Sequence, residues 1–137
     1  MVKVVLISCV SKKLDKKAEA QDLYISSLFK KNLNYAKSLK PNKIFILSAK
    51  YGLLNLNDKV APYNKTLNKM NRIEREKWAK GITAKLRVLT NLKKDKFIFL
   101  AGKKYREYLT KEIKNYEIPT EGLSIGKQLN WLSNKIK

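Results

Sequence analysis

Short apolar runs alternate with stretches of helical periodicity along this chain. Residues 2–7, 44–47 and 96–100 are short and mostly apolar, with many β-branched or aromatic side chains, which predicts three buried strands. Residues 116–119 end in Pro119, and a sheet tolerates proline at its edge, so they predict a short edge strand.

Apolar side chains recur at helical spacing between these runs. The pattern predicts a helix over the second half of residues 20–39, with Ser26 or Ser27 as its N-cap and Pro41 beyond its end. A longer helix is expected over about residues 71–92, where large apolar side chains form one stripe.

The rest of the chain completes an alternating order of strands and helices. One helix should follow the third strand to about residue 114, and the last should begin after Ser124, whose hydroxyl can cap it. Residues 53–68 mix turn residues with isolated apolar ones and predict a long irregular segment lying on the domain. We expect one α/β domain over residues 1–137, three-layered and Rossmann-like, with a mostly parallel sheet of about four strands and helices on both faces.

Composition places the chain among globular proteins. Hydrophobic residues make up 44% of it and charged residues 31%, which suits one packed core rather than a disordered tail. No apolar run approaches the roughly 18 residues that cross a bilayer, so no membrane partner is expected. The N-terminal apolar run is too short for a signal peptide, and the single cysteine cannot form an internal disulfide, so we expect a cytoplasmic protein.

The formal net charge of +20 comes from 31 Lys and Arg residues against 11 Asp and Glu residues. Such an excess predicts attraction to a polyanion: DNA, RNA or an anionic surface. Only four of the basic residues are arginines, which favours diffuse phosphate attraction over base recognition by arginine. The alternative is that a lysine-, asparagine- and isoleucine-rich composition reflects an AT-rich genome without any polyanion partner.

The chain has no histidine, which excludes a Ser-His-Asp triad, a Cys-His pair and any histidine-based metal site. The scattered carboxylates and one cysteine do not suggest a zinc site, so we expect no metal and no cofactor. Proton transfer would have to use Lys, Asp, Glu, Tyr, Cys, a terminal amine or the substrate itself.

The three central strands share an unusual ending, because each finishes in small residues and then lysine. In a parallel sheet these ends meet at one edge, where ligands of α/β proteins bind. Small residues and lysines there suit an anionic ligand with a flat ring, such as a nucleotide or a base flipped out of a strand. Alternatively, small residues ease the turns and lysines only solvate the surface. The endings are Ser8-Cys9 with Lys12-Lys13, Ser48-Ala-Lys-Tyr-Gly52 and Ala101-Gly-Lys-Lys-Tyr105.

Two residues are candidates for chemistry at this edge. Lys13 could act as a nucleophile or Schiff-base former, and Asp22 could orient a lysine or activate water. The simpler alternatives are a solvated loop lysine and a helix-start cap; Cys9 could equally be a core filler, and Glu121 is a second candidate acid. The candidate ligand-binding residues are Ser8, Cys9, Tyr24, Ser27, Ser48, Lys50, Tyr51, Gly52, Tyr63, Gly102 and Lys103.

Five segments together resemble one family of small bacterial and phage proteins of unknown function, labelled peroxide-stress protein YaaA-like. The resemblance covers nearly the whole chain and implies DNA binding that limits oxidative damage, although this shorter sequence contains no recognisable helix-hairpin-helix motif. The segments are Ser8-Cys9 with Lys12-Lys13, Asp22-Leu-Tyr-x-Ser-Ser-Leu-Phe29, Leu47-Ser-Ala-Lys-Tyr-Gly-Leu-Leu54, Pro62-Tyr-x-x-Thr-Leu67 and Gly126-Lys-Gln-Leu-x-Trp-Leu132.

A second resemblance concerns the lysine-transferring domain of archaeosine synthase, which carries a Pro-Cys-x3-Lys-Pro-Tyr-x2-Ser pattern and acts on a 7-deazaguanine base in tRNA. Here Cys9-x3-Lys13 and Tyr24-x2-Ser27 keep the two spacings, but ten residues separate Lys13 from Tyr24 and Ser8 replaces the first proline. The resemblance implies a pocket that handles a base.

Three functions therefore remain open. The first is an enzyme that modifies or releases a nucleobase in DNA or RNA, with a basic surface holding the backbone and tyrosine stacking on the base. The second is a DNA-binding protein of the oxidative-stress type without catalysis. The third is a binder of free nucleotides. The sequence indicates no oligomeric state.

Overall fold

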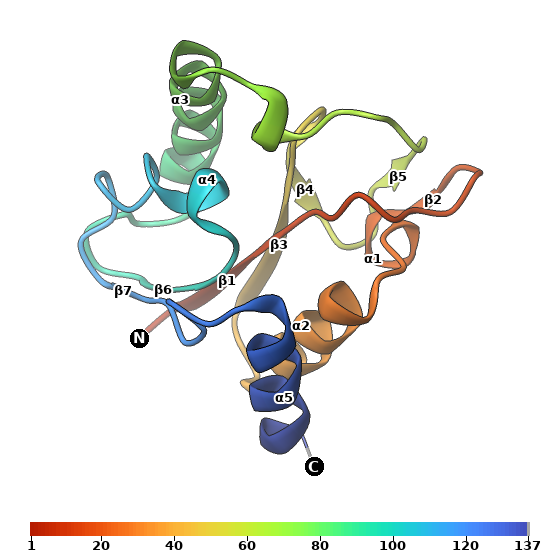
Figure 1. The fold of residues 1–137 in the computed structure, drawn as a ribbon. Helices are drawn as coiled ribbons and strands as arrows, with labels where there is room; N and C mark the ends of the chain where they lie inside the picture. The colour runs from red at the N-terminus through yellow and green to blue at the C-terminus, as the bar shows by residue number, and fades with distance from the viewer. Residues whose placement is uncertain (137) are drawn as a thin grey trace.

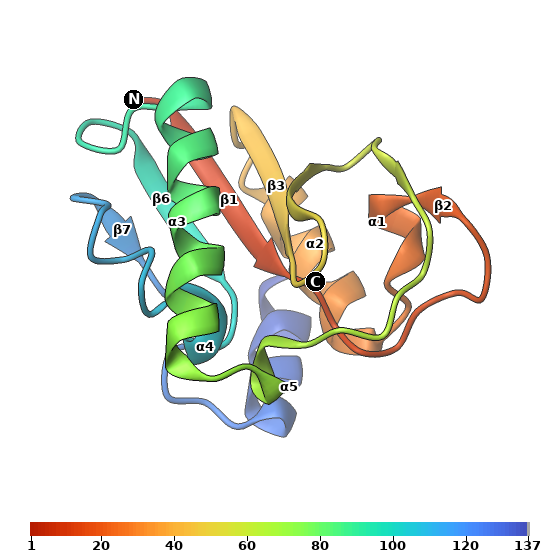
Figure 2. The same ribbon diagram turned by 90° about the horizontal axis from the view of Figure 1, so that it is seen from above.

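The structure, a computed structural model, describes residues 1–136. Within them it has a mixed α/β fold with a five-stranded, mostly parallel sheet and five α-helices (Figures 1 and 2). In chain order the elements are β1 (Lys3–Ser8), β2 (Ala18–Glu19), α1 (Ala20–Leu23), α2 (Ser27–Ser38), β3 (Lys43–Ser48), β4 (Gly52–Asn55), β5 (Lys59–Val60), the 3-10 helix η1 (Leu67–Lys69), α3 (Arg72–Leu89), β6 (Lys96–Leu100), α4 (Lys103–Arg106), β7 (Tyr116–Glu117) and α5 (Ile125–Lys135).

The main sheet has the strand order β4-β3-β1-β6-β7, with β1 at its centre. β1 pairs in parallel with both β3 and β6, and β7 adds a further parallel strand beyond β6. The four residues of β1 from Val4 to Ile7 are fully buried, as an apolar, β-branched run covered on both faces should be. The three buried strands and the edge strand predicted from the sequence are thus all present.

The remaining strand of the main sheet, β4, follows β3 through a tight turn and pairs with it in antiparallel fashion. Gly52 makes this turn possible, because its φ of +76° lies in a region that other residues rarely adopt. The sequence predicts an irregular segment here, because asparagines and an aspartate surround only a few apolar residues. Leu53 and Leu54 are nevertheless buried against the domain, which holds the segment as a strand.

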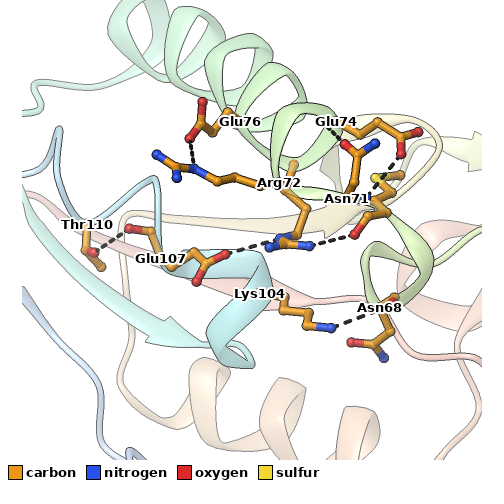
Figure 3. Close-up of polar contacts among 10 residues, drawn as sticks. Asn68, Asn71, Arg72, Glu74, Glu76, Lys104, Glu107 and Thr110 are labelled. Carbon is orange, nitrogen blue, oxygen red and sulfur yellow. Dashed lines mark hydrogen bonds and ion pairs between the residues drawn. The ribbon is translucent and has the colours of Figure 1, made fainter.

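The three longer helices, α2, α3 and α5, begin at side-chain caps. Ser26, rather than Ser27, caps α2 by accepting the backbone N–H of Phe29 at 3.1 Å. At the start of α3, Asn71 accepts the Glu74 N–H while the Glu74 carboxylate accepts the Asn71 N–H (Figure 3). This reciprocal pair explains why the helix starts where the sequence predicts.

Two predicted segments differ from the structure in length and form. The helix expected up to residue 114 is only the single turn α4, followed by further turns in which Leu109 and Ile113 are buried. Residues 53–68 are more regular than predicted: besides β4 they contain β5, which pairs with β2 in a small second sheet.

The helices lie on different sides of the main sheet. In Figure 1, α2 and α5 lie on one side of β1, while α3 and α4 lie on the other. The core formed between these layers and the sheet is continuous and includes Phe29, Leu86 and Phe97. Across residues 1–136, every helix is too short or too polar to cross a lipid bilayer.

Candidate functional site

The carboxyl ends of β1, β3 and β6 lie side by side at one edge of the sheet. Ser8 is in register with Leu47, and Ile7 with Leu100, so the strands end at nearly the same level. The backbone N–H of Cys9 donates to the Leu47 carbonyl at 3.0 Å, which extends the pairing past β1. The small residues that follow each strand are therefore neighbours, as their order in the sequence predicts.

A cluster of hydroxyl groups lies just beyond β3. The Ser48 hydroxyl accepts the backbone N–H of Tyr51 at 3.0 Å and donates to the Tyr63 hydroxyl at 2.9 Å. The Tyr63 and Tyr24 hydroxyl oxygens are 2.7 Å apart. Tyr24, Ser48 and Tyr63, which come from three separate segments, thus share one hydrogen-bond network.

Burial keeps both tyrosines of this network neutral. It raises the pKa of Tyr24 from 10.0 to about 12, against the hydrogen bond from Tyr63, which lowers it. Burial also raises the pKa of Tyr63, and the nearby Cys9 and Tyr24 raise it further. At neutral pH the network therefore offers hydroxyl groups rather than phenolate charge.

Lys13 lies over the aromatic rings of this cluster. Its ammonium is 4.4 Å from the Tyr63 ring centroid and 5.7 Å from that of Tyr24, and it donates to the Ser11 carbonyl at 3.1 Å. A short antiparallel bridge between Lys13 and Tyr24 holds the two segments together. Burial lowers the pKa of Lys13, although Cys9 partly opposes this effect.

Tyr105 links the β1 end to the η1 segment. Its hydroxyl oxygen lies 3.4 Å from the Cys9 sulfur, which donates to it, and 3.4 Å from the backbone nitrogen of Leu67. Burial, followed by the proximity of Cys9, raises its pKa. The Tyr105 ring also packs edge-on against Trp78 of α3, with 5.7 Å between centroids, so its position is fixed from two sides.

Two adjoining cavities open at this edge of the sheet, with volumes of about 360 and 370 Å³. Five lysines line them, and no carboxylate does. The first cavity is lined by Cys9, Val10, Ser11, Lys13, Asn64, Lys65, Thr66, Asn68, Lys69, Tyr105 and Ile125. The second is lined by Ser8, Cys9, Val10, Leu28, Asn32, Asn68, Leu100, Ala101, Gly102, Lys103, Lys104, Tyr105, Ile125 and Gln128.

Polar contacts join the segments that surround the two cavities. Lys104 donates to the Asn68 carbonyl at 3.5 Å, which joins α4 to η1 (Figure 3). Nearby, Arg75 of α3 pairs with Glu107 at 3.2 Å. These contacts place η1, α3 and α4 against one another beside the strand ends.

The structure brings most of the predicted residues to this edge. Ser8, Cys9, Lys13, Gly102 and Lys103 line the cavities, and Tyr24, Ser48 and Tyr63 form the network under Lys13.

Four further predicted residues belong neither to the cavity linings nor to the hydroxyl network of Tyr24, Ser48 and Tyr63. Lys50, Tyr51 and Gly52 belong to the β3–β4 turn, and the Tyr51 hydroxyl donates to the Ala61 carbonyl at 3.1 Å. Ser27 is exposed in the first turn of α2. Because the chain turns back here into an antiparallel strand, residues 50–52 do not enter a strand-to-helix connection, and the Tyr51 ring packs edge-to-face with Tyr63 at 5.5 Å between centroids.

Asp22 is not paired with Lys13. It is exposed on α1, and its carboxylate makes no hydrogen bond or ion pair with any residue of the described chain. The catalytic pair predicted from the sequence is therefore not assembled in this structure, although Lys13 itself lines the first cavity.

Several lining residues were not predicted from the sequence. Lys65 and Lys69 lie in the segment between β5 and α3, close in sequence to Tyr63. The length of that segment could have indicated a functional role for its residues, because long irregular loops in compact domains are usually functional. Asn32 was also missed. It interrupts the buried apolar face of α2 formed by Phe29, Leu33 and Ala36, and a polar residue on such a face marks a candidate site.

A larger cavity, of about 500 Å³, lies between α3 and residues 108–112, away from the strand ends. Glu76 and Glu112 line it together with basic residues, and they pair with Arg72 and Arg87 respectively (Figure 3 shows the first pair). Both of its carboxylates thus have an ion-pair partner, and its lining mixes the two signs of charge, unlike the lysine-lined cavities at the strand ends. Nowhere in residues 1–136 do three His, Cys, Asp or Glu side chains gather closely enough to hold a metal ion.

Comparison with known proteins gives a family but no activity. No curated protein matches the chain significantly. One family of unknown function matches nearly all of it, in agreement with the small domain of unknown function expected from the sequence, and the match includes every strand end and both cavities. The chain therefore belongs to the family of unknown function DUF6884, which matches residues 4–134.

Proposed function

We propose that this protein associates with nucleic acid. It binds a free nucleotide, or a nucleobase within a nucleic-acid strand, at the carboxyl ends of β1 and β6. The observation that carries the proposal is the pair of adjoining cavities lined by five lysines and no carboxylate. An uncompensated group of ammonium ions attracts phosphate, and the net charge of +20 extends that attraction over the molecule.

The strand order of the sheet also favours a ligand site at the carboxyl ends of β1 and β6. β1 has β3 on one side and β6 on the other, so the chain order reverses direction across β1. In open α/β sheets, ligands bind in the crevice at such a switch point. We propose on these grounds that the domain is three-layered and Rossmann-like, with α2 and α5 forming one outer layer and α3 the other.

The chemistry of the lining suits both parts of a nucleotide. Cavities of a few hundred cubic ångströms hold small-molecule ligands, and neutral tyrosines can hydrogen-bond to sugar or phosphate oxygens without repelling them. Tyr105 lines both cavities, so its largely buried aromatic side chain lies at their junction. No carboxylate competes for the lysines, so they remain available to an anion.

The proposal is tested by titrating the protein with nucleoside monophosphates and with short single-stranded DNA and RNA oligonucleotides. Tryptophan emission is a suitable signal, because Trp78 packs against Tyr105. We expect saturable binding that weakens about tenfold in the double variant Lys65→Ala, Lys69→Ala, since two charge-assisted contacts are lost.

The matched control is Lys93→Ala, Lys94→Ala. These lysines are exposed just before β6, at the opposite end of that strand from the cavities, and their loss changes the net charge equally. Equal weakening by both double variants would mean that binding depends on overall charge alone, and absence of binding to every ligand at low salt would refute the proposal.

Catalysis at Lys13 is a second candidate function. A lysine of lowered pKa beside a cavity is the type of group that forms a Schiff base during base excision. Borohydride trapping with DNA that contains an abasic site should then yield a covalent adduct. Lys13→Arg keeps the positive charge but cannot form the adduct, so an adduct that persists in this variant would exclude Lys13.

DNA binding without catalysis, of the kind that the resemblance to peroxide-stress proteins implies, is the third candidate function. If the oligonucleotides bind but no base is released and no adduct forms, the protein is a DNA-binding protein without catalysis, as that resemblance implies. Protection of DNA from peroxide cleavage by bound protein, measured against the Lys65→Ala, Lys69→Ala variant, would then support the protective role.

A further inference from the structure

One polar side chain on the buried face of α2 has an oxygen without a hydrogen-bond partner. Asn32 is 6% exposed, and its Oδ1 accepts no hydrogen bond from the described chain. Its neighbours on the same face of the helix, Phe29, Leu33 and Ala36, are apolar and buried. An unpaired buried amide oxygen destabilises a fold, and an apolar side chain of similar size would avoid that loss. Stability therefore does not explain the presence of Asn32.

Asn32 lies in the wall of the second cavity, of about 370 Å³. Leu28 and Leu100 give this cavity apolar walls, and Gln128 adds a second amide, which is oriented by its bond to the Leu123 carbonyl at 2.9 Å. Apolar walls with a few directed polar groups are typical of pockets that recognise a specific ring.

The lysines of this cavity lie on α4, apart from the helix that carries the amide. Lys103 and Lys104 are exposed at the start of α4, whereas Asn32 is buried on α2. The cavity thus has a charged, solvent-facing part and a buried part with unused hydrogen-bonding capacity. A nucleotide has the same division, between its phosphate and the edge of its base.

We propose that Asn32 determines base specificity in this pocket, by pairing its side-chain amide with the edge of a nucleobase whose phosphate lies among the lysines. The Oδ1 lacks a donor, and a base that presents an N–H group supplies one when the Asn32 amide turns toward the cavity that its residue lines. An asparagine amide pairs in this way with an edge that places a donor beside an acceptor, as the amino edge of adenine does. The inference rests on the proposed function, because it assigns the base-recognising group of the same pocket.

The test compares wild type with Asn32→Leu, which has a similar volume and no amide. Each protein is titrated with the four ribonucleoside 5′-monophosphates and with ribose 5-phosphate, which lacks a base. We expect wild type to bind at least one nucleotide about tenfold more tightly than ribose 5-phosphate, in line with one well-made hydrogen bond inside a pocket. Asn32→Leu should bind all four nucleotides with similar affinity, without the tenfold advantage over ribose 5-phosphate, and should retain the affinity for ribose 5-phosphate.

Thermal unfolding separates recognition from a structural role. Asn32→Leu should unfold at the same temperature as wild type or higher, because it removes an unpaired buried oxygen. Asn34→Leu is the matched control, since Asn34 is exposed on the same helix and should affect neither base preference nor binding. Asn32→Ala provides a second variant without the amide should the leucine prevent folding.

The outcomes separate this inference from the function on which it rests. If nucleotides bind but Asn32→Leu and Asn32→Ala keep the base preference of wild type, the role of Asn32 is refuted and the pocket stands. If wild type binds nucleotides no better than ribose 5-phosphate, base recognition is refuted while phosphate binding remains. If no phosphate-bearing ligand or oligonucleotide binds, both proposals fail.

Homopolymeric single-stranded oligonucleotides distinguish the two sources of such a base. Preference for the same base in the monophosphates and in the oligonucleotides indicates a pocket open to free nucleotides. Preference confined to the oligonucleotides indicates a nucleotide held within a strand. Both results support the role of Asn32, provided that Asn32→Leu abolishes the preference.

Discussion

The Tyr63 hydroxyl joins two other buried or partly buried groups at the strand ends. It lies 2.7 Å from the Tyr24 hydroxyl and 2.9 Å from that of Ser48. Its removal would leave both neighbours short of a partner, and an unpaired buried hydroxyl costs more than the net value of the bond that was lost. The network therefore stabilises the edge of the sheet as well as shaping the site.

We predict that Tyr63→Phe lowers the free energy of unfolding by about 1–3 kcal/mol. Urea denaturation measures this change. Tyr51→Phe is the control, because its hydroxyl bonds to the Ala61 carbonyl at the exposed surface and water can replace it, so a change within about 0.5 kcal/mol is expected. An equally small effect of Tyr63→Phe would contradict a shared, buried network.

Burial of Tyr24 should make stability fall at alkaline pH. Its pKa is 10.0 when unperturbed and about 12 in the folded chain, so between these values the unfolded chain loses a proton that the folded chain keeps. The unfolded state then binds fewer protons, and stability declines as pH rises through this window. Below pH 10 both states are protonated and the full stability is present.

The loss attributable to Tyr24 approaches about 2 kcal/mol at pH 12. Urea denaturation at pH 9, 10 and 11 should show a shallower decline for Tyr24→Phe than for wild type. Tyr116→Phe, which alters an exposed tyrosine, should decline as wild type does. Identical pH dependence in wild type and Tyr24→Phe would show that Tyr24 is not buried in its neutral form.

At the scale of elements, the β3–β4 hairpin depends on one backbone conformation. Gly52 has a φ of +76°, and an added Cβ would meet the Ile82 side chain at 3.6 Å, which is ordinary contact. The cost of a side chain there is therefore conformational and not steric. Gly81, inside α3, presents the opposite case, because an added Cβ would meet no atom within 4 Å.

Alanine at these two glycines should change stability in opposite directions. Gly52→Ala should destabilise the protein by about 1 kcal/mol or more, because alanine is strained at positive φ. Gly81→Ala should stabilise it by about 1 kcal/mol, because glycine is a poor residue inside a helix. Chemical denaturation of both variants checks the signs, and stabilisation by Gly52→Ala would contradict the turn geometry.

At the scale of the molecule, the charge should act at longer range than the pocket. The protein carries a net charge of +20. Each nucleic-acid phosphate that it neutralises releases counterions. A single-stranded oligonucleotide that contacts three or more phosphates should lose more than about tenfold in affinity between 50 and 200 mM salt. A nucleoside monophosphate should lose only about threefold.

The comparison of these two salt dependences distinguishes a pocket from a general polyanion surface. Fluorescence titrations at several salt concentrations provide both slopes. Equal slopes would mean that the oligonucleotide, like the monophosphate, contacts the protein through one phosphate alone. Lack of oligonucleotide binding at 50 mM salt would indicate that the lysine content reflects composition without a polyanion partner.

The sequence by itself determined the central sheet and the place of the candidate site. Short apolar runs rich in β-branched and aromatic residues predict strands, and their alternation with helices predicts that the neighbouring central strands are parallel. Because parallel strands end at the same edge, the small residues and lysines after β1, β3 and β6 could be predicted to meet there. Cys9, Lys13 and Gly102 do line the cavities at that edge.

Only the tertiary structure decided which side chains face one another at that edge. The turn at Gly52 returns the chain as β4 and carries Lys50 to the side, while Asp22 remains exposed and apart from Lys13. Asn32 enters the second cavity because α2 packs beside β1. Contacts of this kind join segments that are distant in sequence, and local periodicity carries no information about the distance between two such side chains.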